Sequence, residues 1–473
     1  MPGLLHPGKH PHVKRALPAL VFLAAALATR LPILHRAVLD WDESLYFLMA
    51  QQWRAGHLPY TTIWDNKPIG IYAIFAVFQA IIPGVAAMRV ATALCVALLA
   101  ATVFRITELL TRDRAAAWAA GLLLVLCSLS NDGLSANTEL FMAAFTALAV
   151  LAVLARAPAP LAGLALGCAF MVKYVMAPEA LAVLLLLWQQ RGARAVLGAM
   201  AAAALPVLAT AALYGAAGHL ALWWDCSVLS NFRRAGVPLR GNVVAAALSL
   251  QAWRWGPLYI TALVLATTAR RRGFVTNFPL LWLLGAVLGA VSAKSFYDHY
   301  FLELLPPLCV LAGYGWSRIH PGGGVRDAFL GFLALLPLHA GWVALRNTTG
   351  PDLPVEVAAA LRTARAQSLY VFDSQPIIYA LTGLTPPTRF VLPSELTGLT
   401  LPQVVGVDPV AELARILSQA PQYIVRREPP PGPAIRNPAV YAALDAALSA
   451  HYMLVQRWPG AALYRLNAEK ETP

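Results

Sequence analysis

Charged residues are scarce in this chain: Asp, Glu, Lys and Arg make up 12% of its 473 residues, whereas hydrophobic residues make up 59%. The mean hydropathy is +0.61. So few charges could not cover the surface of a soluble protein of this size, which excludes an ordinary soluble enzyme. Long apolar runs predict a polytopic α-helical membrane protein instead.

Cysteine and acidic residues are also few. The five cysteines form no CxxC pair and four lie in apolar segments, so neither a disulfide framework nor a metal centre is expected. Basic residues outnumber acidic ones by 36 to 23. They form short clusters between apolar segments, with no stripe of interleaved aromatics, which predicts topology signals and no nucleic-acid partner. There is no glycine-rich phosphate loop, so an activated donor would be lipid-linked rather than a nucleotide.

Apolar segments divide residues 1–346 into eleven expected spans, with the N-terminus in the cytoplasm on an uncleaved signal anchor. With the apolar stretch 69–83 and residues 44–54 lying in the interface, the basic clusters all fall on the cytoplasmic side. The polar segments then all fall outside, including a first outer loop at 35–86. The spans are 16–34, 87–109, 115–131, 139–156, 160–174, 177–190, 195–214, 252–269, 276–292, 301–316 and 328–346. The basic clusters are Arg112/Arg114, Arg156, Arg191/Arg194, 270–272 and Arg318/Arg326, and the outer polar segments are 40–68, 131–139, Lys173, 223–240 and 294–303.

Residues 347–473 are richer in proline and charge and predict a small α/β domain on the same outer side. Alternating strand-like and helix-like pieces carry this prediction, with Asp408 as a helix cap. Strands are expected at 368–372, 389–392 and 422–425, helices at 376–382 and 409–420, and a terminal hairpin at 454–458 and 462–466.

The first outer loop begins with Asp40-Trp41-Asp42-Glu43, followed by Tyr46. On a helix starting near Asp40, Asp42 and Tyr46 share a face. A carboxylate there could accept the proton of an attacking hydroxyl. The same residues also suit helix capping, and spacing alone does not separate the two interpretations.

Lys67, which precedes Pro68, could hold a lipid phosphate as a point charge. A lysine beside an interfacial segment could equally snorkel to the membrane surface. Further cations lie at outer ends of spans, against the inside bias, and as a set they predict an anionic partner. They are Arg89, Lys173, Arg233, Arg234 and Lys294.

Two more outer clusters carry polar side chains. Asn137 and Glu139 start a span, where capping is an alternative to a role in a site. The run from Lys294 to Tyr300 includes Tyr297 and His299. An aromatic belt accounts for its tyrosines, but not for its cation, aspartate and imidazole together.

Taken in order, these residues resemble the bacterial GT-C glycosyltransferases of the protein O-mannosyltransferase and lipid A aminoarabinose transferase superfamily. The similarity covers about residues 16–316. The motifs are Asp42-Glu43 with Tyr46, Gly56-His57-Leu58-Pro59-Tyr60, Lys67-Pro68, Arg89, Asn137-Thr138-Glu139, Gly163-x3-Gly167-x5-Lys173, and Tyr297-x-His299-Tyr300 before Leu304-Leu305-Pro306.

The resemblance implies a membrane enzyme that transfers a sugar with inversion from a polyprenyl phosphate, on the outer face of the bacterial inner membrane. Asp42 would be the general base, and Glu43 would support it or bind acceptor. Lys67, Arg89, Lys173 and Lys294 would bind the donor phosphate. The remaining matched residues would line the substrate site: Tyr46, Tyr60, Asn137, Glu139, Tyr297 and His299.

The chain also departs from that pattern. Aminoarabinose transferases carry an acidic residue where this chain has Asn66, so no metal ligand is predicted and no cofactor is required, although a divalent cation stays an open alternative. The acceptor is expected to be an envelope glycolipid, such as lipid A, or another envelope glycan, with protein as the alternative. From other classes, a transporter or lipid flippase would need polar residues at mid-membrane and broken helices in paired halves. A non-catalytic envelope assembly protein would use the α/β domain as a binding module.

Overall fold

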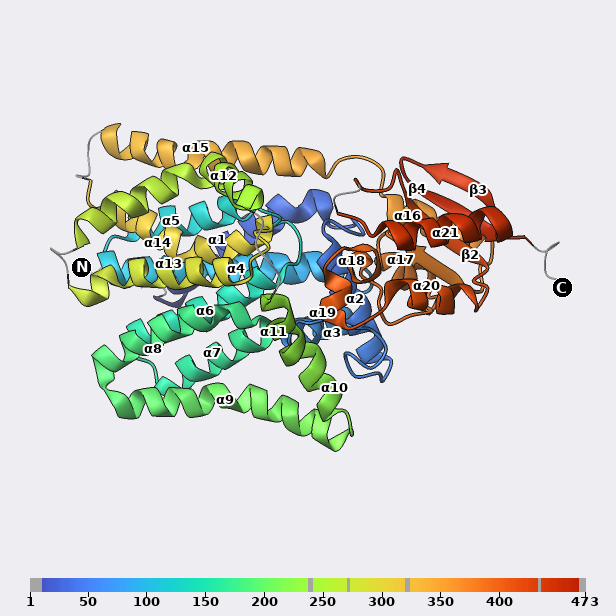
Figure 1. Ribbon diagram of the computed structural model, residues 1–473. Coiled ribbons are helices and arrows are strands. Elements are labelled where there is room, and N and C mark those ends of the chain that lie inside the picture. Colours follow the sequence, from blue (N-terminus) through green and yellow to red (C-terminus); the bar gives the residue numbers. More distant parts are fainter. Residues whose placement is uncertain (1–10, 237–240, 270–272, 320–323, 433–434, 468–473) are drawn as a thin grey trace, which may run out of the picture.

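The computed structural model describes residues 11–236, 241–269, 273–319, 324–432 and 435–467. It is an elongated molecule in which a bundle of helices is covered at one end by an α/β domain (Figure 1). The basic cluster at 270–272 and the last residues of the polar segment 223–240 lie outside the described residues.

Each of the eleven expected spans overlaps one helix of the bundle. Five candidate membrane spans are long and apolar enough to cross a bilayer among the described residues: 16–33, 86–111, 193–216, 274–292 and 324–347. A mostly helical class with several apolar helices is therefore confirmed, and the number of crossings stays a prediction. The helices are α1 Pro11–Arg30, α4 Ala86–Thr111, α5 Arg114–Cys127, α6 Thr138–Leu154, α7 Ala159–Val172, α8 Ala177–Arg191, α9 Ala193–Ala216, α12 Gly241–Thr267, α13 Phe274–Ser292, α14 Leu305–Ser317 and α15 Gly324–Asn347.

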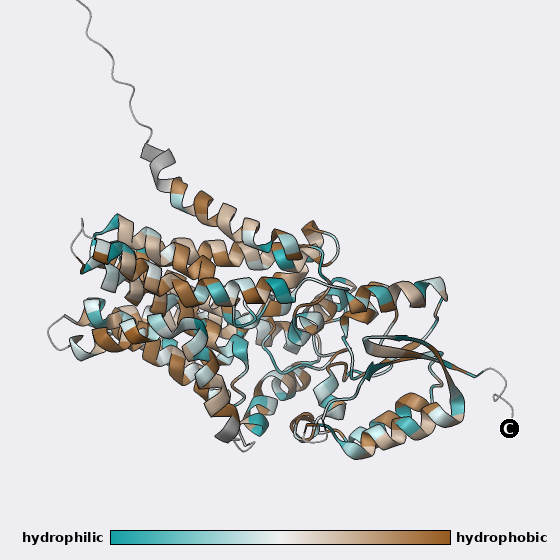
Figure 2. Ribbon diagram, turned by 90° about the horizontal axis from the view of Figure 1, so that it is seen from above, coloured by the Kyte–Doolittle hydropathy of each residue, from teal (hydrophilic) through white to brown (hydrophobic). Residues whose placement is uncertain are grey.

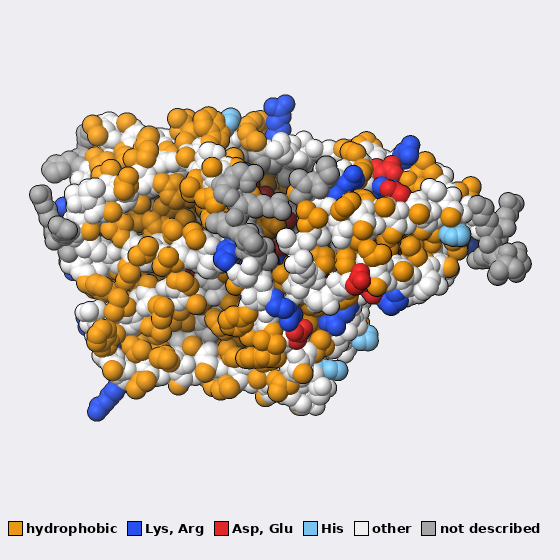
Figure 3. All heavy atoms as spheres, viewed as in Figure 1, with side chains coloured by type: hydrophobic (Ala, Val, Ile, Leu, Met, Phe, Trp, Pro, Cys, Tyr) orange, Lys and Arg blue, Asp and Glu red, His pale blue; other side chains and the backbone are white. Residues whose placement is uncertain are grey.

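The outer surface of the bundle is apolar. Leu197 and Leu205 on α9 are 65% and 58% exposed, and Leu335 on α15 is 65% exposed. Figure 2 shows hydrophobic residues along the bundle helices, and Figure 3 shows hydrophobic side chains across the visible face of the bundle. Exposed apolar area of this extent marks a surface that faces something other than water, as a lipid-facing bundle does.

Small residues allow two of the helices to approach closely. A Cβ atom on Gly163 of α7 would lie 1.9 Å from the carbonyl oxygen of Ala199 on α9, and one on Gly167 would lie 2.4 Å from that of Ala203. Glycine at such contacts is typical of membrane helix packing. The Gly163-x3-Gly167 part of the motif therefore has a packing role.

Short elements gather at the end of the bundle that meets the α/β domain (Figure 1). The first outer loop contributes α2, which begins after Asp40, and α3, which at 12 residues is too short to cross a bilayer. The remaining elements carry the other polar segments. The bounds are α2 Trp41–Arg54, α3 Gly70–Ile81, η1 Leu31–Ile33, η2 Tyr174–Met176, α10 Leu220–Trp224, the π-helical η3 Asp225–Leu229, α11 Ser230–Ala235 and η5 Asp298–Leu304.

The α/β domain is built on a four-stranded sheet in the order β1-β2-β4-β3, with β1 and β2 parallel and the other pairs antiparallel. One face packs on α20 and α21, and the other joins the core that continues into the bundle. The bounds are α16 Leu353–Thr363, β1 Leu369–Phe372, α17 Ile377–Thr382, α18 Pro393–Thr397, α19 Leu401–Val405, α20 Pro409–Leu417, β2 Tyr423–Glu428, α21 Pro438–His451, β3 Tyr452–Trp458 and β4 Gly460–Leu466.

One expected strand of this domain is absent. Residues 389–392 join no sheet in the described chain, and bends stand at Arg389 and Leu392. The carbonyl of Arg389 instead accepts the N–H of Trp64 in the first outer loop, at 2.9 Å. The prediction was wrong because the extended pattern serves a contact between domains. The Asp408 cap is confirmed, since its carboxylate accepts the N–H groups of Val410 and Ala411.

Candidate active site

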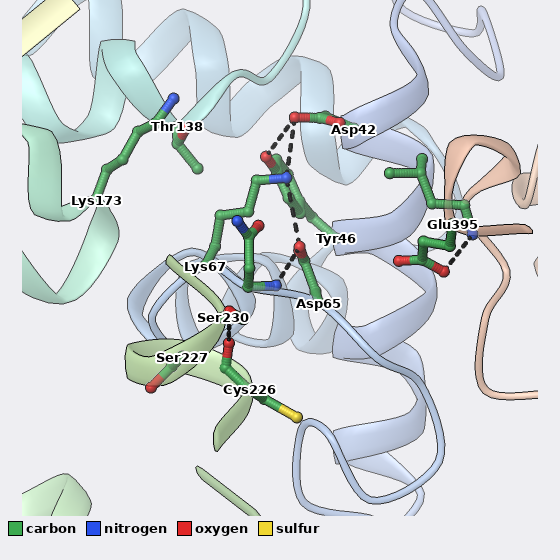
Figure 4. A network of polar contacts seen from close by, with 12 residues as sticks. Asp42, Tyr46, Asp65, Lys67, Thr138, Lys173, Cys226, Ser227, Ser230 and Glu395 are labelled. Carbon is green, nitrogen blue, oxygen red and sulfur yellow. Dashed lines mark hydrogen bonds and ion pairs between the residues drawn. The ribbon is translucent and has the colours of Figure 1, made fainter. Parts of the chain in front are cut away.

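A cation and two carboxylates meet where the start of α2 approaches a later part of the first outer loop, at residues 65–67. Asp42, in the first turn of α2, accepts a hydrogen bond from the Tyr46 hydroxyl at 3.1 Å. The Lys67 ammonium lies 3.2 Å from Asp42 and 3.4 Å from Asp65. Figure 4 shows Lys67 reaching toward both carboxylates. The loop therefore folds back and places a cation beside the face that Asp42 and Tyr46 share.

These charges shift one another's pKa. Burial alone would raise the pKa of Asp42, but the Lys67 ammonium, followed by His299 and Lys173, holds that pKa well below its usual range. Burial opposes the charge on Lys67, but Asp42 and Asp65 raise its pKa above the ordinary value. Both groups are therefore ionised at neutral pH.

A second ion pair comes from the bundle. Lys173, at the end of α7, pairs with Glu139 in the first turn of α6. Its ammonium lies 4.0 Å from the centre of the Tyr300 ring, within cation–π range. His299 on η5 lies 4.0 Å from Glu139 through Nε2 and 3.6 Å from Asp40 through Nδ1. Segments far apart in sequence thus converge on one place.

A cavity of about 210 Å³ lies where these segments meet. Lys67, Lys173 and Arg234 line it, each from a different segment. Arg234 donates to the Ser295 hydroxyl at 3.1 Å and to the Tyr300 hydroxyl at 3.2 Å. Among the described residues that line the cavity, none is acidic. Three cations around such a space suit a phosphate group.

Arg89 and Glu43 take no part in this cavity lining. They form a fully buried ion pair at 2.5 and 2.7 Å, which links α4 to α2. Glu43 also accepts the N–H groups of Leu39 and Ala136, at 2.5 and 2.9 Å. Every strong contact of the pair is internal. We therefore do not assign Arg89 to the phosphate or Glu43 to the acceptor, and place both in the support of the Asp42 helix.

Lys294 and Tyr60 also lie outside the cavity lining. Lys294 is exposed and donates to the carbonyl of Ala235, so its charge is directed at the backbone. Tyr60 is fully buried, and its hydroxyl donates to the carbonyl of Lys67 at 2.5 Å. Tyr60 therefore holds the backbone of Lys67 in place.

Asn137 and Tyr297 stand at the edge of the site. Asn137 is the N-cap residue of α6 and donates to the carbonyl of Asp132 at 3.1 Å. Tyr297 is 55% exposed and stacks on His299 with ring centres 5.7 Å apart. Asn137 therefore supports the start of α6, which carries Glu139, and Tyr297 packs on His299 of η5.

The donor set does not fit a divalent cation. Asn66 donates its amide to Asn231 at 3.2 Å, and Asn231 donates to the Asn66 carbonyl at 2.8 Å. The nearby carboxylates of Asp42 and Asp65 are both paired with Lys67. In the described ranges, no three His, Cys, Asp or Glu residues form a group that could hold a metal ion. A hard cation needs several free oxygen ligands.

Sequence reasoning included Arg234 only as one of five outer cations expected to have an anionic partner, and it gave neither Tyr300 nor Asn231 a role in the site. Arg234 was visible as a cation at the outer end of a span, but nothing in its segment ranked it above its neighbour Arg233. Arg233 pairs with Asp225 on the surface, at 2.8 Å. Tyr300 was absorbed by the aromatic-belt interpretation. Only the fold shows that these residues turn inward.

Comparisons with known proteins show what the sequence and the fold resemble. A family model described as dolichyl-phosphate-mannose-protein mannosyltransferase matches residues 66–228. The fold is similar to that of ArnT from Cupriavidus metallidurans bound to undecaprenyl phosphate, with a TM-score of 0.66 and 13% identity. It is also similar to the apo form of the Archaeoglobus fulgidus oligosaccharyltransferase, with a TM-score of 0.54 and 11% identity. A comparison with curated proteins finds no match.

The chain thus has the fold of the GT-C membrane glycosyltransferases, and the resemblance to that superfamily is confirmed. The likeness to ArnT covers 97% of this chain and 99% of that chain, so it includes the α/β domain. The likeness to the archaeal enzyme covers 88% of this chain and 70% of that chain.

Proposed function

We propose that this protein is a membrane glycosyltransferase that moves a sugar from a polyprenyl phosphate to a hydroxyl acceptor, with inversion. One observation carries the proposal. The carboxylate of Asp42 stands beside a cavity lined by Lys67, Lys173 and Arg234. A base next to a fixed phosphate site is what this reaction needs. The ArnT structure with undecaprenyl phosphate supports a donor of the same lipid class.

The reaction follows from these positions. The donor phosphate binds the three cations, and its sugar lies toward Asp42. Asp42 accepts the proton of the acceptor hydroxyl as that oxygen bonds to the anomeric carbon. The bond from that carbon to the phosphate oxygen breaks, and its electron pair leaves with the polyprenyl phosphate. The cations and the Tyr300 hydroxyl stabilise the charge that develops on the leaving group.

Lys67 links binding to chemistry. In the structure its ammonium is shared between Asp42 and Asp65, and this pairing keeps Asp42 a weak base. A bound phosphate would draw the Lys67 ammonium toward itself. Asp42 would then lose part of the stabilisation of its charged form, and its pKa would rise toward the value of an effective base.

The acceptor we propose is an envelope glycolipid, such as lipid A, or another envelope glycan. The site would face the periplasm from the bacterial inner membrane, with the α/β domain on that side. The match to a protein mannosyltransferase model favours a protein hydroxyl as the second candidate acceptor. The flippase and binding-module alternatives are less favoured, because neither requires a carboxylate next to a cation-lined cavity.

A transfer assay with purified protein in detergent tests the proposal. Lipid extract from the source membrane supplies donors, and mass spectrometry follows envelope glycolipids, glycans and proteins. Wild-type protein should add a hexose- or pentose-sized mass to one acceptor class and release polyprenyl phosphate. If lipid-linked sugars are present and consumed by no acceptor, the proposal fails and the binding-module alternative gains support.

A further inference from the structure

Arg389, on the α/β domain, contacts two segments that each lead to a cation of the proposed donor cavity. Its guanidinium donates to the carbonyl of Tyr60 at 3.1 Å and to the Cys226 sulfur at 3.4 Å. Its own carbonyl accepts the N–H of Trp64 at 2.9 Å. Tyr60 and Trp64 belong to the loop that ends in Lys67, and Cys226 lies in η3, just before α11. One residue therefore touches the segments that carry Lys67 and Arg234.

The segment that carries Arg389 is itself fixed to the α/β domain. The Thr388 hydroxyl donates to Glu412 on α20 at 2.5 Å, and Arg415 donates to the carbonyl of Pro387 at 2.9 Å. A second contact joins the domain to α11, the helix that carries Arg234, because Arg233 donates to the carbonyl of Val404 at 2.8 Å. The segment that carries Arg389 is therefore held to the α/β domain on both sides of Thr388.

Tyr60 shows why this contact matters. Its φ is +70°, a left-handed conformation that a bulky residue adopts only when the surroundings impose it. Arg389 holds its carbonyl, and its phenol donates to the carbonyl of Lys67 at 2.5 Å. A path of direct contacts thus runs from Arg389 through Tyr60 to Lys67. Asn231 on α11 connects the segment of Arg234 to that of Lys67, because it donates to the carbonyl of Asn66 at 2.8 Å.

We propose that Arg389 is a positioning residue: through Tyr60 and η3, the α/β domain sets the placement of Lys67 relative to Arg234 and so the affinity for the donor phosphate. The inference rests on the proposed function, because it assigns the domain a part in donor binding by the same cavity. A domain that only recognises acceptor would leave donor affinity independent of this contact.

The test compares Arg389→Ala, Arg389→Lys and Tyr60→Phe with wild type. Arg457→Ala is the matched control, since Arg457 is an exposed arginine of the same domain that pairs with Glu428. Donor KM, acceptor KM and kcat are measured with the transfer assay, and binding of undecaprenyl phosphate is measured separately. Arg389→Ala should raise the donor KM about tenfold and weaken the binding of undecaprenyl phosphate by a similar factor, as expected for losing hydrogen bonds from a charged group. Arg389→Lys and Tyr60→Phe should show smaller losses in the same direction, and acceptor KM should not change.

A double variant separates positioning from general stability. Adding Arg389→Ala to Lys67→Ala should weaken donor binding by clearly less than the tenfold loss expected in the wild-type background, because much of the effect of Arg389 is exerted through Lys67. The inference would be overturned if the losses of the two single variants multiplied in the double variant, or if Arg389→Lys and Tyr60→Phe both bound donor as wild type does. Either result would leave the proposed function intact. Wild-type protein that neither binds undecaprenyl phosphate nor transfers sugar would instead overturn the proposed function.

Discussion

The ammonium of Lys67 lies 3.2 Å from the carboxylate of Asp42, although the two residues stand on opposite arms of the first outer loop. Lys67 also lies 3.4 Å from Asp65, so the cation is shared. With side-chain exposures of 10% and 22%, Lys67 and Asp42 are largely shielded from water, and Lys67 lines the cavity. In the proposed function, this pair supplies the ionised base and one of the cations that bind the donor phosphate.

Replacing Lys67 with alanine should weaken donor use more than acceptor use. The variant loses a charge-assisted contact worth about 1.5–3 kcal/mol, which corresponds to roughly a 10–100-fold rise in donor KM. Arg105→Ala is the control, because Arg105 pairs with Glu108 away from the cavity. Steady-state kinetics with varied donor provide the measurement. An unchanged donor KM would remove Lys67 from the phosphate site.

Breaking the buried pair of Glu43 and Arg89 should destabilise the protein. Either single alanine variant leaves an unpaired buried charge, at a cost of about 3–5 kcal/mol. Thermal unfolding in detergent should show a lower midpoint for both, with the exposed-pair variant Arg105→Ala close to wild type. A variant with leucine at both positions should recover part of the loss. Full stability in a single alanine variant would contradict a structural role.

The charge on His299 should make stability depend on pH. Burial opposes protonation, but Glu139, Asp132 and Asp40 outweigh it and raise the pKa to about 10 from the ordinary 6.5, with Lys173 acting in the opposite direction. The protonated ring therefore contributes stability fully below pH 6.5, and this contribution is lost as pH rises through about 10. The unfolding midpoint of wild type should exceed that of His299→Gln most at pH 6. The difference should shrink toward pH 10, and a constant difference would contradict this sign.

The sequence predicted the membrane class, the helices and most of the elements of the α/β domain, because periodicity and composition carry these signals locally. It also grouped Asp42, Lys67, Glu139 and Lys173, since each interrupts the expected pattern at the same side of the membrane. Their contacts in the structure join segments that are far apart in the chain.

The sequence could not rank cations that look alike. Arg89 and Arg234 are both predicted at outer ends of spans, yet Arg89 pairs with Glu43 and Arg234 lines the cavity. The difference depends on whether a carboxylate packs beside the arginine, and only the tertiary structure determines this. For the same reason, residues 389–392 have a strand-like pattern but pair with the first outer loop through Arg389.

The most direct test of this account is transfer by Asp42→Asn. Asparagine keeps the shape but cannot accept the proton, so transfer should fall on the order of 10²–10⁴-fold. Glu108→Gln, a carboxylate-to-amide change in the exposed pair with Arg105, should keep wild-type activity. Undecaprenyl phosphate should still bind Asp42→Asn, since the lining cations remain. Sugar transfer at the wild-type rate by Asp42→Asn would contradict the assignment of Asp42 as base.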